Sequence, residues 1–264
     1  MLLELKNITK QFAIKSDFLK ITRGVVKAAD GVSLGVNSGE HLSIVGESGC
    51  GKTTLARIIL QLIQQDAGEV IFKGQDVSSF NREDRQSFHQ KVQMVFQDPY
   101  SSLDPLYTIR GILNEAFVFE RSLGKSEREG RMKSTLKSVQ LSDDILGRFP
   151  HEFSGGERQR IAIARALMMQ PELLVLDEAV SSLDTIIQGQ IIELLKNIQK
   201  DFPVTYLFIS HNLRVVKKIS AKIAVMYQGK ILEWGKAEDI FKNPRHPYTQ
   251  ELLAAALEYK SKKI

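Results

Sequence analysis

The chain has 264 residues, 43% hydrophobic and 25% charged, which is enough to build a sizeable core in one large α/β domain or two smaller ones. Its net charge of +5 is too small to indicate nucleic acid or a membrane surface, and its single cysteine, Cys50, excludes an internal disulfide and a cysteine-based metal or iron–sulfur site from this chain alone. No apolar run approaches the roughly 20 residues of a membrane span, and the first residues lack the pattern of a signal peptide, so we expect a cytosolic protein.

The first segments predict two strands separated by a surface excursion. Residues 2–8 alternate between apolar and polar side chains, as a half-buried strand does. The aromatic residue that follows, Phe12, is either a core residue at a strand end or a ring on which a base stacks. Residues 13–27 are basic and irregular, so we expect them to run over the surface before a second strand at 31–36.

The most informative stretch is Gly46-Glu-Ser-Gly-Cys-Gly-Lys-Thr53, which matches the phosphate-loop pattern G-x-x-x-x-G-K-[ST]. An apolar run at 41–46 precedes it and a helical pattern at 53–63 follows, in the strand–loop–helix order that the motif requires. Its glycines let backbone N–H groups converge on phosphate oxygens, Lys52 can reach the β- and γ-phosphates, and the Thr53 hydroxyl is placed to bind Mg²⁺. A plain glycine-rich turn is the alternative. We predict nucleotide contacts from Gly46, Glu47, Ser48, Gly49, Cys50, Gly51, Lys52, Thr53 and Thr54.

Downstream of the phosphate loop the pattern predicts a strand at 69–74, a charged helix at about 81–91 and a second strand at 92–97. Pro99 ends the second strand and begins a loop. From Tyr107 to Phe149 the pattern is helical and hydrophilic, with glycine and serine breaks. It therefore predicts a helical insertion between two strands of the core.

Residues 153–160, Phe-Ser-Gly-Gly-Glu-Arg-Gln-Arg, lead into a further helix. Ser154 and Glu157 have the spacing of a capping box, in which the Glu157 carboxylate folds back to the Ser154 N–H. A cap needs no glycine at the first two helical positions, where glycine costs up to about 1 kcal/mol against alanine. Bare backbone at a helix start binds anions, so this segment is either a plain cap or a second phosphate-binding element.

Two buried strands end in polar residues. Residues 173–178 form a parallel-type strand that ends in Asp177 and Glu178. Asp177 is the expected partner of the Mg²⁺ shell, and Glu178 is then free to polarise the attacking water, unless the pair is only a solvated turn. The strand at 204–210 ends at His211, where open α/β sheets bind ligands, and this position supports a γ-phosphate contact.

Taken in this order, the segments resemble the ATP-binding subunits of ABC transporters over nearly the whole chain. The resemblance implies an α/β fold, a P-loop NTPase (RecA-like) core with an antiparallel β subdomain and an inserted helical subdomain. It also implies an ATPase with ATP and Mg²⁺ as cofactors. Each ATP would lie between the phosphate loop (Walker A) of one subunit and the signature at Ser154 of another, so that catalysis requires a dimer.

The resemblance implies a role for each candidate residue. Glu178 is the catalytic base, His211 the switch histidine and Lys52 the Walker A lysine. Mg²⁺ is held by Thr53, by Gln97 of the Q-loop and by Asp177 of Walker B. The remaining nucleotide contacts come from Phe12, which stacks on adenine, and from Gln97, Ser154, Gly155, Gly156 and Asp184, the last belonging to the D-loop at 182–184.

The resemblance also implies a division of the chain and a branch of the family. The ATP-binding domain spans 1–257, with its core at 1–97 and 170–242, the helical insertion at about 98–169, a C-terminal extension at 243–257 and a basic tail at 258–264. The phrases Tyr100–Pro105 and Asn243–Thr249 resemble importers of dipeptides, oligopeptides and nickel. Ala179, where the peptide systems more often have proline, favours nickel. Because Cys50 stands alone, we expect no iron–sulfur cluster.

The expected partners are membrane-spanning permease subunits, a paralogous ATPase that completes a heterodimer, and an extracytoplasmic solute-binding protein. We expect no nucleic acid, and a peripheral location at the cytoplasmic face of the cell (inner) membrane. Some apolar residues of segment 98–120 are expected to form a groove for a short cytoplasmic helix of the permease, and the others to pack inside the helical insertion. These residues are Leu103, Leu106, Tyr107, Ile109, Ile112 and Leu113.

Two rival functions use the same phosphate loop. An ABC-type ATPase that acts on DNA or ribosomes usually carries a coiled coil or a second ATPase unit, whereas here only 56 residues separate Gln97 from Ser154, without sustained heptads. A P-loop kinase would not explain the signature, the D-loop and His211 together. The sequence therefore favours a transport ATPase, and its cargo stays open between nickel and peptides.

Overall fold

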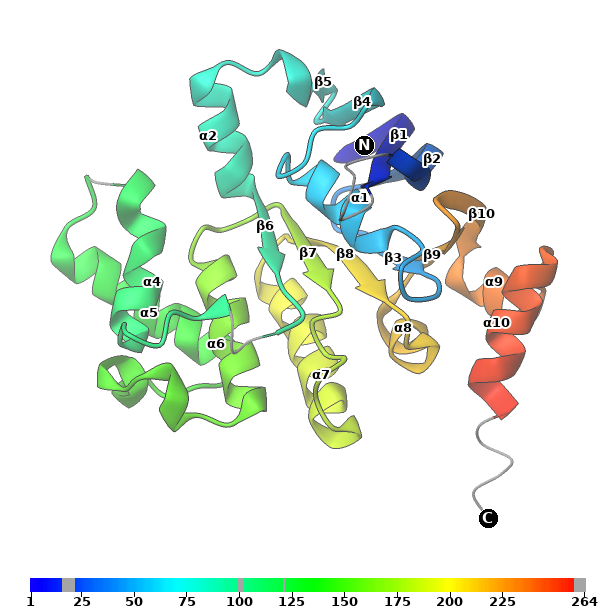
Figure 1. The fold of residues 1–264 in the computed structure, drawn as a ribbon. Helices are drawn as coiled ribbons and strands as arrows, with labels where there is room; N and C mark the ends of the chain where they lie inside the picture. Colours follow the sequence, from blue (N-terminus) through cyan, green and yellow to red (C-terminus); the bar gives the residue numbers. More distant parts are fainter. Residues whose placement is uncertain (16–21, 99–101, 121, 259–264) are drawn as a thin grey trace. The chain divides into compact units, whose positions relative to one another are not determined.

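The structure is a computed structural model that describes residues 1–15, 22–98, 102–120 and 122–258. Part of the Tyr100–Pro105 phrase and residues 259–264 of the basic tail lie outside the described residues. The chain forms two compact units, one of residues 1–86 with 206–264 and the other of residues 87–205 (Figure 1). Among the described residues, no helix combines the length and the apolar character that a membrane span requires.

The first unit contains an antiparallel sheet in the order β2-β1-β4-β5. Its strands are β1 (Leu3–Lys15), β2 (Thr22–Val36), β4 (Ala67–Phe72) and β5 (Gln75–Asp76). Along β1 the apolar residues Leu3, Leu5 and Ile8 are fully buried, which confirms the half-buried strand predicted there. A 3₁₀ turn at Val77–Ser79 follows the sheet, and helix α2 (Arg82–Lys91) comes next, as predicted.

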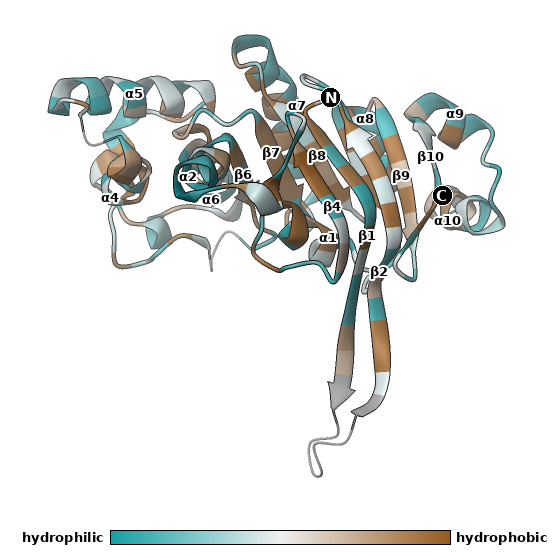
Figure 2. Cartoon of the chain, turned by 90° about the horizontal axis from the view of Figure 1, so that it is seen from above, coloured by the Kyte–Doolittle hydropathy of each residue, from teal (hydrophilic) through white to brown (hydrophobic). Residues whose placement is uncertain are grey.

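The surface excursion predicted for residues 13–27 is wrong, because both of its described ends are strand. β1 continues to Lys15 and β2 begins at Thr22, in register with Phe12 opposite Val26 and Ala13 opposite Val25. Pairing with β4 stops at Thr9, so the far half of the hairpin stands beyond β4 (Figure 2). The valines of β2, Val25 and Val26, favour a pleated strand, a preference that the basic composition of the segment did not indicate.

The first unit also holds the strands that carry the phosphate loop. β3 (His41–Val45) pairs in parallel with β8 (Thr205–Ser210) and with β9 (Lys222–Tyr227), and β10 (Lys230–Lys236) runs antiparallel to β9. The helices of this unit are α1 (Lys52–Ile59), α8 (Leu213–Ile219), α9 (Ala237–Lys242) and α10 (Pro247–Glu258). Helix α1 ends at Ile59 instead of Ile63, because Gln61 adopts a left-handed backbone with φ 57°.

The second unit combines two parallel strands with helices. β6 (Val92–Val95) pairs with β7 (Leu173–Asp177), and helices α6 (Gly155–Leu167) and α7 (Thr185–Asp201) flank β7 in the sequence. The helical pattern predicted from Tyr107 to Phe149 is confirmed. Its elements are α4 (Ile109–Asn114), α5 (Lys125–Ser138) and 3₁₀ turns at Glu115–Phe119 and Asp143–Gly147, with a further turn at Pro150–Glu152.

Candidate active site

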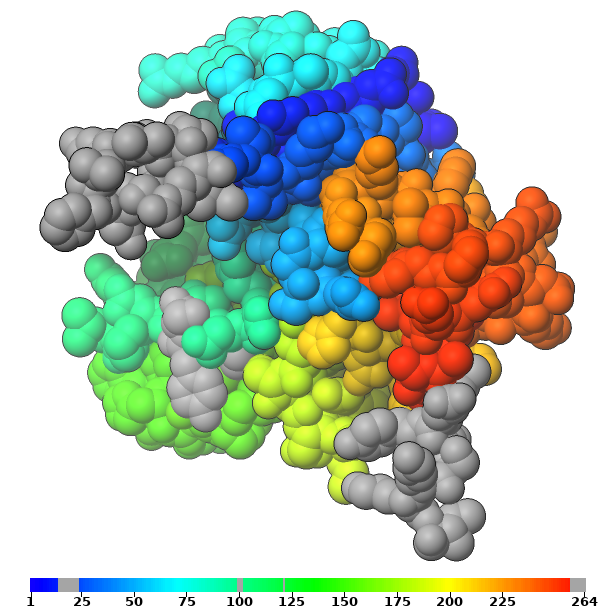
Figure 3. All heavy atoms as spheres, turned by 45° about the vertical axis from the view of Figure 1, so that its right-hand side comes forward, coloured from blue at the N-terminus to red at the C-terminus, as the bar shows by residue number. Residues whose placement is uncertain are grey.

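The phosphate loop leaves β3 at Val45 and enters α1 at Lys52. Gly46 and Gly51 have φ angles of 156° and 112°. A β-carbon at Gly46 would lie 2.1 Å from the carbonyl oxygen of Met226, and one at Gly51 would lie 1.9 Å from that of Ala28. Both positions therefore demand glycine for shape as well as for backbone freedom. Figure 3 shows the light-blue region that contains the loop at the surface, beside the orange β10 region and the red helix α10.

Lys52 is 4% exposed, and its ammonium group is held by the loop that it follows. Nζ donates to the carbonyl oxygens of Gly46 at 2.8 Å and of Glu47 at 2.7 Å, and it lies 3.7 Å from Cys50 Sγ. An ammonium group has three donors, and a thiol sulfur is a weak acceptor. The third donor is thus the one that a phosphate oxygen would take. Burial raises the pKa of Cys50 despite the nearby Lys52 charge, so the thiol stays protonated at neutral pH.

Phe12 and His211 are also in the first unit. Phe12 is 41% exposed, which excludes the core-aromatic alternative, and its ring lies 5.5 Å from Lys10 Nζ. Val26, directly opposite on β2, is 47% exposed. His211 is exposed in the turn between β8 and α8, and Asn212 caps α8 by accepting the N–H groups of Arg214 and Val215. Phe12 and Val26 thus present an exposed apolar surface on which a planar ring such as a base can stack. His211 follows the carboxyl end of the parallel strand β8.

In the second unit, β7 delivers Asp177 and Glu178. Asp177 is 5% exposed at the end of the strand, and Glu178 is half-buried. Glu178 has a φ of 49°, and its carbonyl oxygen accepts both the N–H of Ser181 at 2.9 Å and the Ser181 hydroxyl at 2.8 Å. A left-handed backbone costs a non-glycine residue about 1 kcal/mol or more. The hydrogen bonds of the turn therefore stabilise Glu178 in a backbone conformation that is unfavourable for an isolated glutamate.

The capping box predicted at the start of α6 is confirmed. Oε2 of Glu157 accepts the Ser154 N–H at 2.9 Å and the Ser154 hydroxyl at 2.7 Å, while the Glu157 N–H donates to the hydroxyl oxygen at 3.4 Å. The Ser154 hydroxyl and N–H lower the pKa of Glu157, so its carboxylate is ionised at neutral pH. Its charge is therefore directed at Ser154, as expected from the spacing.

The two glycines of this segment differ in what surrounds them. A β-carbon at Gly156 would lie 2.8 Å from Ile187 Cγ2 of α7, whereas one at Gly155 would lie 3.5 Å from Leu183 Cδ2. Gly156 is thus explained by helix packing, which the sequence pattern could not distinguish from anion binding. Gly155 has no packing requirement, so its bare backbone remains the feature that favours an anion.

The Q-loop and the D-loop meet within the second unit. Ser182 Oγ donates to the carbonyl oxygen of Gln97 at 3.4 Å, and Gln97 itself is exposed. Asp184 Oδ1 accepts the N–H groups of Ile186 and Ile187, both at 3.0 Å, and so caps α7. Asp184 therefore has a structural role that its place in the motif did not predict.

The candidate residues form two sets, one in each unit. Phe12, the phosphate loop with Thr54, and His211 belong to the first, and the second holds Gln97, Ser154, Gly155, Gly156, Asp177, Glu178 and Asp184. The Thr53 hydroxyl and the Asp177 carboxylate are hard oxygen donors of the kind that Mg²⁺ prefers. No group of three histidine, cysteine or acidic side chains gathers as a metal site among the described residues. Mg²⁺ needs no such cage, since it uses one or two protein oxygens with phosphates and waters.

Sequence reasoning missed the residues that support the phosphate loop from outside it. The carbonyl groups of Ala28 and Met226 lie where a side chain at Gly51 or Gly46 would have to be. The N–H of Gly229 donates to the carbonyl oxygen of Cys50 at 3.0 Å, and the Tyr248 hydroxyl accepts the N–H of Glu47. Backbone contacts of this kind leave no pattern in a sequence. Tyr248 lies in the phrase Asn243–Thr249, whose sequence indicates the branch of the family but not a contact with the phosphate loop.

Comparisons with known proteins agree with this geometry. A family model described as "ABC transporter" matches residues 29–181, and one described as "Oligopeptide/dipeptide transporter, C-terminal region" matches residues 232–264. The chain is 48% identical to the oligopeptide transport ATP-binding protein AppF of Bacillus subtilis (strain 168), over 96% of this chain and 78% of that protein. It is 45% identical to the glutathione import ATP-binding protein GsiA of Escherichia coli (strain K12), over 96% of this chain but 41% of that longer protein.

The solved structures establish the fold. The ATP-binding cassette MJ0796, in a dimeric post-hydrolysis state bound to ADP and Pi, superimposes with a TM-score of 0.76 at 28% identity, over 89% of this chain and 99% of that one. The predicted fold class, an α/β P-loop NTPase of the ABC ATPase type, is thereby confirmed. The chain belongs to the ABC transporter family, as one of the ATP-binding subunits that hydrolyse ATP to drive transport.

Proposed function

We propose that this subunit powers the import of small peptides, by coupling ATP binding and hydrolysis to the movement of a membrane permease. The match of residues 232–264 to the C-terminal region of oligopeptide and dipeptide transporters carries this proposal. The names of AppF and GsiA, an oligopeptide and a glutathione system, support the same class of cargo. Nickel, favoured above by Ala179, has no support from these relatives and rests on that one residue.

The cargo is tested by ATP-driven uptake into vesicles that contain the purified transport complex and its binding protein. We expect di- or oligopeptides to be accumulated and to stimulate ATP hydrolysis, with no accumulation of Ni²⁺. Uptake of Ni²⁺ without peptide would overturn the peptide assignment and restore the nickel alternative. Association of the chain with DNA or ribosomes, without a membrane partner, would overturn the transport function itself.

We assign the catalytic roles as the motifs suggest. Lys52 binds the phosphates through its third donor, Glu178 orients and deprotonates the attacking water, and His211 contacts the γ-phosphate. Thr53, Gln97 and Asp177 are the oxygen donors for Mg²⁺, which when bound would neutralise charge on the phosphate oxygens. The ATP held by this chain would also contact the other loop residues with Thr54 and, through adenine, the Phe12 ring. Ser154, Gly155, Gly156 and Asp184 of this chain would contact the ATP held by the partner ATPase.

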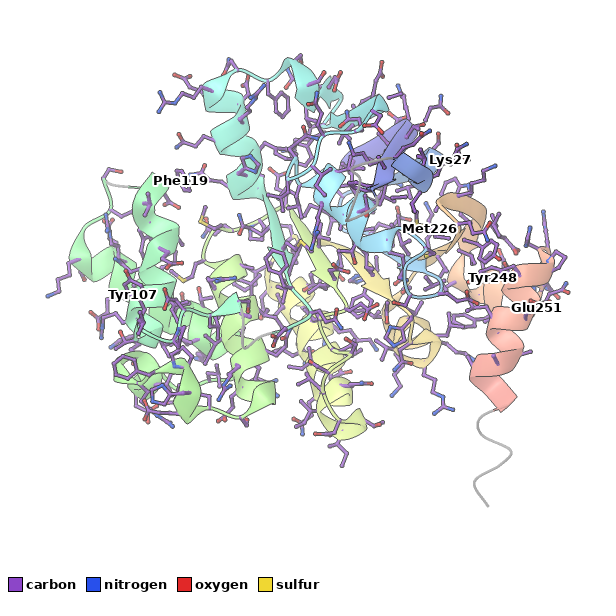
Figure 4. The ribbon with its side chains drawn as sticks, in the orientation of Figure 1. Lys27, Tyr107, Phe119, Met226, Tyr248 and Glu251 are labelled. Carbon is purple, nitrogen blue, oxygen red and sulfur yellow. The ribbon has the colours of Figure 1, made fainter. Side chains whose placement is uncertain are left out.

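We further propose that the second unit docks a short cytoplasmic helix of the permease. A groove of about 520 Å³ is lined by residues 102–106, Ile112, Glu115 and Arg165. Leu106 of this lining is 82% exposed, the next residue, Tyr107, is 53% exposed, and Phe119 is 49% exposed (Figure 4 labels Tyr107 and Phe119). The other residues predicted for this segment are buried and pack within the helical insertion, and two of them, Leu103 and Ile112, also line the groove: Leu103, Ile109, Ile112 and Leu113.

The proposed assembly pairs this chain with a paralogous ATPase, at the cytoplasmic face of the cell membrane, and contains no nucleic acid. We retain the division into core, helical insertion at about 98–169, extension at 243–257 and basic tail as a proposal. Mass measurement of the intact membrane complex tests the pairing. One copy of this chain beside a second, different ATPase is expected, and two copies of this chain without another ATPase would contradict it.

A further inference from the structure

The start of α10 touches the phosphate loop through one tyrosine. The hydroxyl oxygen of Tyr248 accepts the backbone N–H of Glu47 at 3.2 Å. Its half-buried ring packs on Tyr227, with ring centroids 4.3 Å apart, and it lies on the side of α10 that faces the end of β9 at Met226 (Figure 4). Burial raises the pKa of Tyr248, so the hydroxyl is neutral at physiological pH and can accept this bond.

The bonded N–H belongs to the same peptide group that positions Lys52. The peptide between Gly46 and Glu47 presents its N–H to Tyr248 and its carbonyl oxygen to Lys52 Nζ, at 2.8 Å. Rotation of this peptide would break both bonds at once. The next carbonyl, that of Glu47, accepts Lys52 Nζ at 2.7 Å as well, so the orientation of one peptide determines the environment of the ammonium group.

The segment that carries Tyr248 is itself fixed to β10. Glu233 accepts the N–H of Arg245 at 2.9 Å through Oε1 and the N–H of His246 at 3.0 Å through Oε2. His246 Nδ1 in turn accepts the N–H of Tyr248 at 3.1 Å. A chain of hydrogen bonds therefore runs from a strand of the core through the C-terminal segment to the phosphate loop.

We propose that Tyr248 is a positioning residue for ATP binding. Its hydroxyl fixes the Gly46–Glu47 peptide, and through it the Lys52 ammonium, in the orientation that receives phosphate. A loop that is ordered in advance loses less conformational entropy when the ligand binds, so the C-terminal segment raises the affinity for ATP without touching it. This role rests on the nucleotide site proposed above, and it assigns a task to the region matched as the oligopeptide/dipeptide transporter C-terminal region.

Tyr248→Phe removes the hydroxyl and keeps the ring pair with Tyr227. The matched control is Tyr227→Phe, which removes a hydroxyl that bonds to Gln228 Nε2 at 3.2 Å. A single hydrogen bond of this kind corresponds to about a two- to tenfold change in an equilibrium constant. We expect Tyr248→Phe to raise the Kd for ATP of the full-length chain, and the KM of the transport complex, by that factor with kcat unchanged. Tyr227→Phe is expected to change neither.

Amide hydrogen exchange reports directly on the bond between the Tyr248 hydroxyl and the Glu47 N–H, independently of ATP binding. Exchange at the Glu47 amide should accelerate in Tyr248→Phe and remain as in wild type in Tyr227→Phe. Wild-type ATP affinity in Tyr248→Phe would overturn the proposal. An equal loss of affinity in both variants would also overturn it, because the effect would then not be specific to the hydroxyl that bonds to Glu47. Lys52→Ala separates this outcome from failure of the site, because undiminished ATP binding in that variant would overturn the nucleotide site itself.

Discussion

Replacing Glu157 with glutamine tests whether its carboxylate serves only the helix cap. Glutamine can fill the same capping box, with its amide oxygen accepting the Ser154 N–H. The variant loses one negative charge that accepts two hydrogen bonds from Ser154, at 2.9 and 2.7 Å. A complete cap is worth about 1 kcal/mol, and because Glu157 is exposed and glutamine retains most of the geometry, we expect the free energy of unfolding to fall by less than about 0.5 kcal/mol.

The assays are urea unfolding of the purified chain and ATPase activity of the transport complex. We expect ATPase activity to change by no more than about twofold, since the carboxylate is occupied by the Ser154 N–H and hydroxyl. Glu157→Ala is the matched variant that removes the carboxylate half of the capping box while Ser154 still caps the helix, and it should lose up to about 1 kcal/mol of unfolding free energy. Loss of most ATPase activity in Glu157→Gln, with unfolding unchanged, would refute the reasoning by showing a direct role for the charge.

Three further predictions follow from the geometry. Lys52→Ala should abolish ATP hydrolysis while circular dichroism shows an unchanged fold, because it removes the charge-assisted contact to the transferring phosphoryl group; measurable turnover would contradict this. Gly156→Ala should lower the free energy of unfolding, measured in urea, by about 1 kcal/mol. Overpacking against Ile187 costs about 1–3 kcal/mol, and the gain in helix propensity offsets at most about 1 kcal/mol of it. The control Gly155→Ala should not lower the free energy of unfolding. Burial raises the pKa of Glu233, but the N–H groups of His246 and Arg245 hold it below its ordinary 4.5. The hydrogen bonds from those amides should therefore persist above pH 4.5 and be lost as the pH falls through the lowered pKa of Glu233 in the folded chain. Hydrogen exchange at the Arg245 and His246 amides measures this loss, and Glu233→Gln should show no such acid transition.

The phosphate loop, the capping box and the strand ends at Asp177 and His211 could be predicted from the sequence because each is specified by neighbours in the chain. Residue spacing alone encodes which glycines, hydroxyls and carboxylates stand at a strand end or a helix start. The resemblance then supplied a proposed role for Gln97, and it favoured base stacking over a core position for Phe12.

Features that depend on residues far apart in the sequence could not be predicted. The strand segments at 13–15 and 22–27 were missed because they stabilise each other, and neither is recognisable from its own sequence pattern. Gly156 is explained by Ile187, more than thirty residues later, and the loop glycines by Ala28 and Met226. The left-handed Glu178 and the contact between Tyr248 and Glu47 likewise have no local signal.

Single-turnover hydrolysis by the Glu178→Gln transport complex tests most directly whether Glu178 is the base of an ATP-hydrolysing subunit. Glutamine preserves the shape of the half-buried side chain and leaves Asp177 in place, so Mg²⁺ and ATP should still bind. General-base catalysis contributes about 10²- to 10⁴-fold, so hydrolysis should fall at least about a hundredfold while ATP remains bound to the closed dimer. Hydrolysis at near the wild-type rate would contradict the account.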